Sequence, residues 1–176
     1  MAINRAPFNL LVDDDGTNTV GTVFGKQDIK DVILDPVDAA IVRPVPTGWA
    51  LVWSLVGGSG LALGNGTLTT NYTKDGRFVT FSFAITAGST TNFGSGGAFY
   101  SFTLPVPGAD PLQMNFVASV WAAGGGTVVP ATGVAYDPST FNIINGAGQP
   151  IGPTIPAAWW GTSARIQVNG SYFSAS

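Results

Sequence analysis

The stretch RFVTFSFAIT, residues 77–86, decides the fold class of this chain. From Val79 onward every second residue is apolar, and the residues between them are small or hydroxylated. Successive side chains of a β-strand point to opposite faces, so this alternation predicts a strand with one buried face. The buried face would consist of Val79, Phe81, Phe83 and Ile85.

The residues around this stretch extend the β pattern in both directions. Asp75-Gly76, in TTNYTKDGRF (69–78), is a dipeptide typical of a type I′ hairpin turn. Gly- and Pro-rich spacers such as GSTTNFGSGGA (88–98) separate further short alternating runs, which predicts seven or eight strands in all. We therefore expect an all-β body, a β-sandwich or jelly roll. The other runs are GWALVWSLV (48–56), FYSFTL (99–104), MNFVASVWA (114–122), GVAY (133–136), FNII (141–144) and ARIQVNGSYF (164–173).

The first part of the chain differs from the rest. Residues 1–25 show neither a helical nor a strand period, which favours an extended arm. In KQDIKDVILD, residues 26–35, three apolar residues at helical spacing predict one short helix, and Pro36 ends it. We therefore expect an N-terminal arm over residues 1–43 and a β-body over residues 44–176.

Charge is scarce and unevenly distributed. Charged residues make up 10% of the chain, against roughly 25% in an average soluble domain. Residues 1–43 hold seven Asp and four Lys or Arg, a net charge of −3, whereas residues 44–176 hold three of each, a net charge of zero. A neutral body lacks the field that attracts phosphates, so we expect no nucleic-acid partner.

Composition also bears on location. There is no Cys, which excludes disulfides and thiolate chemistry. The sequence has no run of 18 apolar residues, and MAINRAPFN lacks the plan of a signal peptide, so we expect synthesis in a cytoplasm and no membrane partner.

The acidic segment DDDG, residues 13–16, has two interpretations. A calcium loop of the EF-hand type needs oxygen ligands at positions 1, 3 and 5, Gly at position 6 and a bidentate Glu at position 12. With Gly16 at position 6, position 1 is Leu11 and position 12 is Thr22, neither of which fits. The alternative, an Asx turn closed by Gly16, is favoured, and we expect no metal site.

The residue types of an active site are also sparse. The chain has no His, Cys or Glu, which removes the usual general bases and thiol nucleophiles. A glycosidase could use two carboxylates, but Asp75 lies at a hairpin turn, and Asp110 and Asp137 each precede a proline in a turn-forming pair. We expect no catalysis and no cofactor.

Tryptophans offer a further candidate site. They could form a stacking platform for a glycan, or they could pack in the core or in an oligomer interface, which is the commoner role of such residues. The candidates for an oligomer interface or a glycan contact are Trp49, Trp121, Trp159 and Trp160, with Trp53 nearby in sequence.

Several motifs resemble known virion proteins. RAPFNLLVDDDGTNTVGTVFGKQDIKDVILDPVDAA, residues 5–40, resembles the N-terminal segment of small virion proteins of tailed bacteriophages. TTNYTKDGRFVTFSFAITAG, FTLPVP and RIQVNGSYF are similar to a trimeric β-sandwich module of phage fibres, spikes and head decorations. The matching positions are Tyr72, Gly76, Arg77, Leu104, Pro105 and Tyr172.

The resemblance implies a structural protein of the bacteriophage virion. We expect a capsid decoration (cement) protein, made in the host bacterial cytoplasm, that forms a trimer and attaches to other virion proteins, in particular the major capsid protein. The alternative is a short tail fibre or receptor-binding tip that recognises a host surface glycan. The arm residues expected to contact the partner are Phe8, Leu10, Leu11, Asp13, Asp14, Asp15, Val20, Val23 and Phe24.

Overall fold

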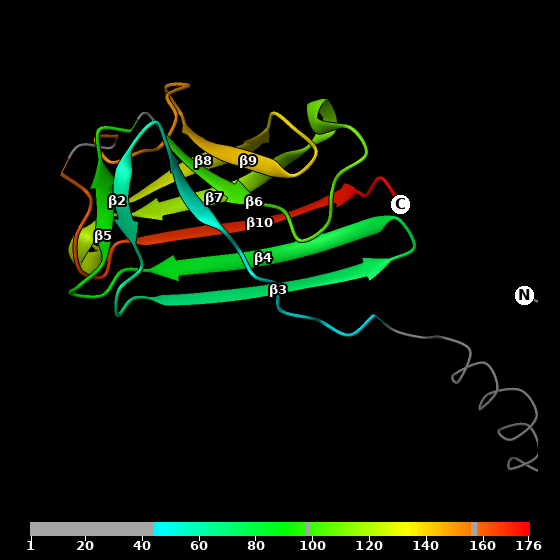
Figure 1. Ribbon diagram of the computed structural model, residues 1–176, viewed down its shortest axis with the longest axis horizontal. Helices are drawn as coiled ribbons and strands as arrows, with labels where there is room; N and C mark the ends of the chain where they lie inside the picture. Colours follow the sequence, from blue (N-terminus) through cyan, green and yellow to red (C-terminus); the bar gives the residue numbers. More distant parts are fainter. Residues whose placement is uncertain (1–43, 98, 156–157) are drawn as a thin grey trace, which may run out of the picture. The chain divides into compact units, whose positions relative to one another are not determined.

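The computed structural model describes residues 44–97, 99–155 and 158–176, and residues Pro44–Ser176 form one compact unit (Figure 1). The arm, its helix at residues 26–35, the DDDG segment and all the predicted arm contacts lie outside the described residues.

The regular secondary structure of the described body is almost entirely β-strand, which confirms the all-β prediction. Two short 3-10 turns, η3 (Pro111–Gln113) and η4 (Ala123–Gly125), flank β7. The strands are β1 (Trp53–Val56), β2 (Ser59–Ala62), β3 (Thr67–Asp75), β4 (Phe78–Thr86), β5 (Asn92–Ser95), β6 (Phe99–Thr103), β7 (Asn115–Trp121), β8 (Val128–Ala135), β9 (Thr140–Asn145) and β10 (Arg165–Phe173).

Eight of these strands form one antiparallel sheet in the order β1-β6-β9-β8-β7-β10-β4-β3. The sheet curls, so that β4 near one end faces β6 and β9 near the other (Figure 1). Ring contacts cross this space: Phe83 on β4 lies 5.4 Å from Phe102 on β6, and Phe81 lies 6.1 Å from Phe141 on β9. The body has the two packed layers of a sandwich, although one continuous sheet supplies both.

Strand alternation places the core between these layers. On β4, Val79, Phe81, Phe83 and Ile85 are between 0% and 3% exposed, as the alternation predicts. Phe116 on β7 packs edge-on against Phe81 and Phe141, with centroid distances of 4.9 and 5.1 Å. Each buried aromatic side chain removes a large apolar area from water, so this cluster supplies much of the stability of a body without disulfides.

The β3–β4 hairpin differs from the predicted turn type. Asp75 pairs with Phe78, so the two turn residues are Gly76 and Arg77. Gly76 has a φ of +58°, but the described non-glycine residues with positive φ are Ala158 and Ser163 alone, which excludes Arg77. A type I′ turn needs positive φ at both positions, whereas type II′ needs it only at the first. The turn therefore matches type II′, with Gly76 at the position that requires glycine.

One predicted spacer contains a strand. β5 lies within GSTTNFGSGGA and pairs with β2 in a separate two-stranded sheet. Both strands have only four residues and include glycine, so they carry no alternating pattern that could reveal them in the sequence.

The segment that enters β1 links the two edges of the curled sheet. Thr47 exchanges two backbone hydrogen bonds of 2.8 Å with Tyr72 on β3. Further along, the backbone N–H of Val52 donates to Thr103 Oγ1 on β6 (2.9 Å), and the Thr103 N–H donates to the Val52 carbonyl (3.1 Å). Residues 47–52 thus tie β3, at one end of the strand order, to β6 near the other.

Candidate functional site

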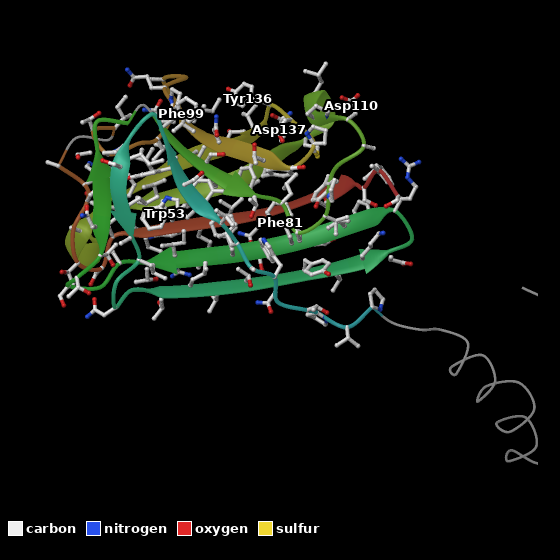
Figure 2. All side chains as sticks on the ribbon, in the orientation of Figure 1. Trp53, Phe81, Phe99, Asp110, Tyr136 and Asp137 are labelled. Atoms are coloured by element: carbon white, nitrogen blue, oxygen red, sulfur yellow. The ribbon has the colours of Figure 1, made fainter. Side chains whose placement is uncertain are left out.

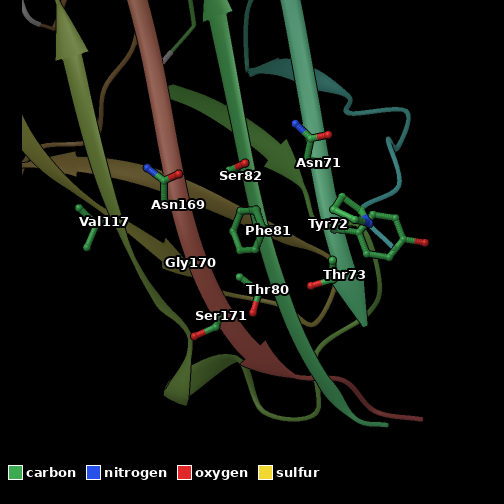
Figure 3. Close-up of a pocket in the computed structure, with 11 residues that line it drawn as sticks. Asn71, Tyr72, Thr73, Thr80, Phe81, Ser82, Val117, Asn169, Gly170 and Ser171 are labelled. Carbon is green, nitrogen blue, oxygen red and sulfur yellow. The ribbon is translucent and has the colours of Figure 1, made fainter. Parts of the chain in front are cut away.

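The outer surface of β3, β4 and β10 carries ladders of uncharged polar side chains. Asn71, Ser82 and Asn169 lie opposite one another across the three strands. The next ladder along consists of Thr73, Thr80 and Ser171. These six residues, together with Val117 on β7, are called the outer polar face below (Figure 3).

A shallow hollow of about 550 Å³ lies over the outer polar face. None of its lining residues is Asp, Glu, Lys or Arg. At the β7 side of the hollow, Val117 lies opposite Asn169 and is 71% exposed. The hollow therefore offers hydroxyl and amide groups beside an apolar side chain, without a fixed charge.

Apolar side chains lie at both ends of the same surface of the sheet. Phe78 and Phe173 pair across β4 and β10, with ring centroids 5.5 Å apart, and they are 43% and 62% exposed. At the opposite end, the Arg165 guanidinium lies 5.2 Å from the Trp121 ring centroid. Such a cation–π contact covers one face of the indole.

The edge strand β3 borders this surface. Its backbone partner on the outer side, within the part of the chain that the structure describes, is Thr47 opposite Tyr72. Residues 67–73 of β3 carry no charge. Natural proteins usually protect a long edge strand with charges, proline or a covering segment, since its free N–H and C=O groups can pair with another chain.

The structure does not gather all the tryptophans in one platform. Trp49 is half-buried and packs edge-on against Tyr72, Phe81 and Phe83, at 6.0 to 6.3 Å. Trp160 stacks on Phe93 at 4.9 Å, at the end of the body that carries β2 and β5.

The other tryptophans also have neighbours within the body. The Trp160 indole N–H donates to the Gly152 carbonyl (2.7 Å), and Trp53 lies 5.3 Å from Tyr100. Trp159 is half-buried and packs against the core, and Trp121 lies beneath Arg165 as described above. Each tryptophan thus has an intramolecular packing role, and Trp53 and Trp160 share Phe93 and Tyr100 as neighbours.

Each carboxylate in the described part of the chain lies at a turn. Asp110 Oδ1 accepts a hydrogen bond from the Leu112 N–H (3.0 Å) at the start of η3, and Asp75 ends β3 at the hairpin. Asp137 accepts from the backbone N–H groups of Ser139 (2.7 Å) and Thr140 (2.9 Å) and from the Thr140 hydroxyl. Burial raises the pKa of Asp137, but these three hydrogen bonds outweigh it and hold the pKa below its ordinary value.

Among residues 44–97, 99–155 and 158–176, no three His, Cys, Asp or Glu side chains lie together in a way that could hold a metal ion. In the same residues, no helix has the length and apolar character needed to cross a lipid bilayer.

Sequence reasoning did not single out the outer polar face. On β4 and β10 its residues alternate with the buried core residues. In the sequence they stand out only because none of them is charged. Their assembly into ladders depends on the pairing of β4 with β10, which lie more than 70 residues apart in the chain.

The structure is similar to solved structures of a viral fibre protein. One is the C-terminal receptor-binding domain of avian reovirus fibre sigmaC, in a Zn crystal form, with 15% sequence identity, a TM-score of 0.38 and coverage of 75% of this chain and 74% of that chain. Another is avian reovirus sigmaC in a C2 crystal form, with 14% identity, a TM-score of 0.39 and coverage of 75% and 62%. No protein-family model matches the chain, and no curated protein matches it.

Proposed function

We propose that this protein is a non-enzymatic structural component of a bacteriophage virion, a capsid decoration protein whose body forms a trimer through the outer polar face and whose residues 1–43 join the particle. One observation carries the proposal: the outer polar face and the adjacent edge strand β3 are free of charge over residues 67–73, 80–82 and 169–171. The sequence resemblance to phage virion proteins supplies the setting.

The physical argument starts from the charges. Interface cores are depleted of charged side chains, whereas solvent-facing sheets and edge strands ordinarily carry them. The body holds only Lys74, Asp75, Arg77, Asp110, Asp137 and Arg165, with a net charge of zero, so its copies do not repel one another. Phe78, Phe173 and Val117 add exposed apolar area next to the polar ladders, which another copy could cover.

A charge placed in the outer polar face tests the assembly. Sedimentation velocity of the full chain at micromolar concentration should give a trimer. Asn169→Lys should shift the protein toward monomer, because three ammonium groups would be brought into an uncharged contact. Ala147→Lys adds the same charge to an exposed turn far along the sheet order and should remain a trimer. A wild-type monomer, or a fully trimeric Asn169→Lys variant, would contradict the role of this face.

The place on the particle needs a separate test. Antibody labelling of intact virions, read by electron microscopy, should show the protein on the head. Labelling confined to the tail would instead assign it to a fibre or tip.

A receptor-binding tip is the second candidate function. The observation that favours it is an exposed aromatic side chain beside a polar pocket: Tyr136, on the other half of the curled sheet, is 64% exposed next to the ionised Asp137 (Figure 2).

A further inference from the structure

A second pocket, of about 450 Å³, lies on the outer side of β1, β6 and β9. It is called the Tyr136 pocket here. Its polar and aromatic lining consists of Phe99, Ser101, Tyr136, Asp137, Thr140 and Asn142, and Val56 and Pro150 complete it.

Strand alternation explains why these side chains face outward. On β6, Tyr100 and Phe102 are fully buried in the core, so Phe99 and Ser101 point to the opposite surface. Ser101 pairs with Asn142 on β9, which brings their side chains to the same position on that surface. Asn142 is nevertheless only 9% exposed, so its amide belongs to the floor of the pocket.

The floor is held in place by hydrogen bonds. In the amide orientation that satisfies its neighbours, Asn142 Nδ2 donates to the backbone carbonyls of Tyr100 (3.3 Å) and Phe141 (3.2 Å). An amide fixed in this way presents a defined polar surface rather than a mobile one.

Asp137 contributes a carboxylate that is held in place by hydrogen bonds and can still accept one more. A carboxylate offers about four acceptor positions. Oδ1 uses two for the N–H groups of Ser139 and Thr140, and Oδ2 uses one for the Thr140 hydroxyl. One acceptor position on Oδ2 therefore remains for a donor from a ligand.

Tyr136 supplies the apolar side of the pocket. Tyr136 is 64% exposed, in contrast to Tyr100 and Tyr172, which are buried. An exposed ring with a polar tip, beside hydroxyl, amide and carboxylate groups, suits a ligand that has an apolar C–H face and hydroxyl donors at its rim.

The charges that line the Tyr136 pocket limit the kind of ligand that it can bind. None of the described residues that line the Tyr136 pocket is basic, and Asp137 is the one carboxylate among them. A phosphate, sulfate or uronate would meet an unpaired negative charge at close range. A metal cation would find a single carboxylate, whereas hard cations take several oxygen ligands.

We propose that the Tyr136 pocket binds one neutral pyranose unit of a saccharide, with the sugar's C–H face on the Tyr136 ring and a hydroxyl donating to Asp137 Oδ2. This inference rests on the second candidate function, receptor binding, and is independent of self-assembly through the outer polar face. Loss of one therefore leaves the test of the other intact.

Saturation-transfer NMR on the full chain, with methyl glycosides of glucose, galactose, mannose and N-acetylglucosamine as probes, tests the proposal. At least one of these should bind with a dissociation constant on the order of 1 mM, the range expected of a small polar ligand in an open site. Methyl glucuronide should bind at least about tenfold more weakly, because its carboxylate faces Asp137. Failure of every neutral glycoside to bind, or equal binding of the glucuronide, would overturn the proposal.

Variants locate the binding. Tyr136→Ala should weaken the affinity for the glycoside by about tenfold or more. Tyr136→Phe keeps the ring and should retain the affinity. Leu112→Ala removes an exposed apolar side chain that belongs neither to the Tyr136 pocket nor to the outer polar face, and it should leave glycoside binding unchanged. Asp137→Asn can still accept from Ser139 and Thr140 and should lose the discrimination against the glucuronide.

The variants also separate the alternatives. Binding that survives Tyr136→Ala would place the saccharide elsewhere and refute the assignment. If Tyr136→Ala dissociates the trimer and no glycoside binds the wild type, the pocket is a contact between copies, which also refutes it.

Discussion

At the scale of single residues, Gly170 decides whether the aromatic core can close. A Cβ at this position would lie 2.4 Å from Phe116 Cδ1, a distance that non-bonded atoms cannot adopt. Phe116 cannot move aside easily, because Phe81, Phe141 and Tyr172 pack around it at 4.9 to 6.0 Å. The absence of a side chain at Gly170 is thus part of the packing.

Gly170→Ala should therefore lower the free energy of unfolding by about 1–3 kcal/mol, the usual cost of overpacking. Gly146→Ala is the matched control, since its φ is not positive and a Cβ there meets nothing within 4 Å. It should be neutral within about 0.5 kcal/mol. Urea unfolding followed by tryptophan fluorescence measures both, and equal stabilities would show that Phe116 has room to shift.

The Tyr172 hydroxyl joins the last strand to the loop after β6. It donates to the Val106 carbonyl (2.5 Å) and accepts from the Val106 N–H (3.2 Å). Burial raises the pKa of Tyr172 to about 12, with a smaller raising effect from Tyr72, although the Val106 hydrogen bond lowers it. Because the folded state holds the proton more tightly, this contribution to stability is complete below pH 10 and is lost as the pH rises through 12.

Tyr172→Phe should cost about 1–3 kcal/mol at pH 8, since it leaves the Val106 groups without their partner. Between pH 10 and 11.5 the wild type should lose stability more steeply than the variant. Some decline should persist in the variant, because burial also raises the pKa of Tyr100. Tyr136→Phe, at an exposed site, is the control, and parallel pH profiles for wild type and Tyr172→Phe would refute this account.

At the scale of elements, the side chain of Thr70 adds to the two Thr47–Tyr72 backbone bonds in holding the segment 47–52 on β3. Thr70 Oγ1 donates to the Trp49 carbonyl (2.9 Å) and accepts from the Trp49 N–H (3.1 Å). The hydroxyl thus replaces the backbone partner that a regular strand would supply, and Trp49 is held over Phe81 and Phe83 as a result.

Thr70→Val keeps the shape of this side chain but removes both bonds, so it should cost about 1–3 kcal/mol. Thr69→Val makes the same change at the neighbouring position of β3, where the side chain is exposed, and should stay within about 0.5 kcal/mol of the wild type. Hydrogen exchange of the Trp49 amide should accelerate in Thr70→Val alone. An unchanged exchange rate would mean that the segment is held by other contacts.

At the scale of the whole molecule, the net charge and the aromatic core lie in different parts of the chain. The net charge of −3 lies in residues 1–43, whereas the aromatic core lies within residues 44–176. If the arm attaches the protein to the particle, most of the binding free energy should come from apolar side chains such as Phe8, Leu10 and Phe24. Each contributes roughly 1.5–3 kcal/mol when buried, compared with about 0–1 kcal/mol for an exposed ion pair.

Deletion of residues 2–25 should therefore leave a folded β-body that no longer joins particles. Replacement of Asp13, Asp14 and Asp15 by Asn should weaken attachment modestly, and mainly at low ionic strength. Binding of each purified variant to particles that lack the protein measures both effects. Full occupancy by the truncated protein would show that the arm is not the anchor.

Local patterns in the sequence determined the class of fold and the positions of most strands. The alternation in RFVTFSFAIT assigned Val79, Phe81, Phe83 and Ile85 to the core, because a period of two is a property of one strand and needs no partner. The Asp75-Gly76 pair located the hairpin, but its turn type depended on the register of Asp75 with Phe78. The short strands β2 and β5 lacked any such pattern.

Only the tertiary structure decided which strands are neighbours, and with them the surfaces that can bind. Pairing of Asn169 with Ser82, and of Ser101 with Asn142, joins residues 87 and 41 positions apart in the chain. The contact of Tyr172 with Val106 and the space that Gly170 leaves for Phe116 arise from the same long-range pairing. No local period encodes these contacts, since they depend on how the sheet curls to bury its aromatic face, and that requires the whole chain at once.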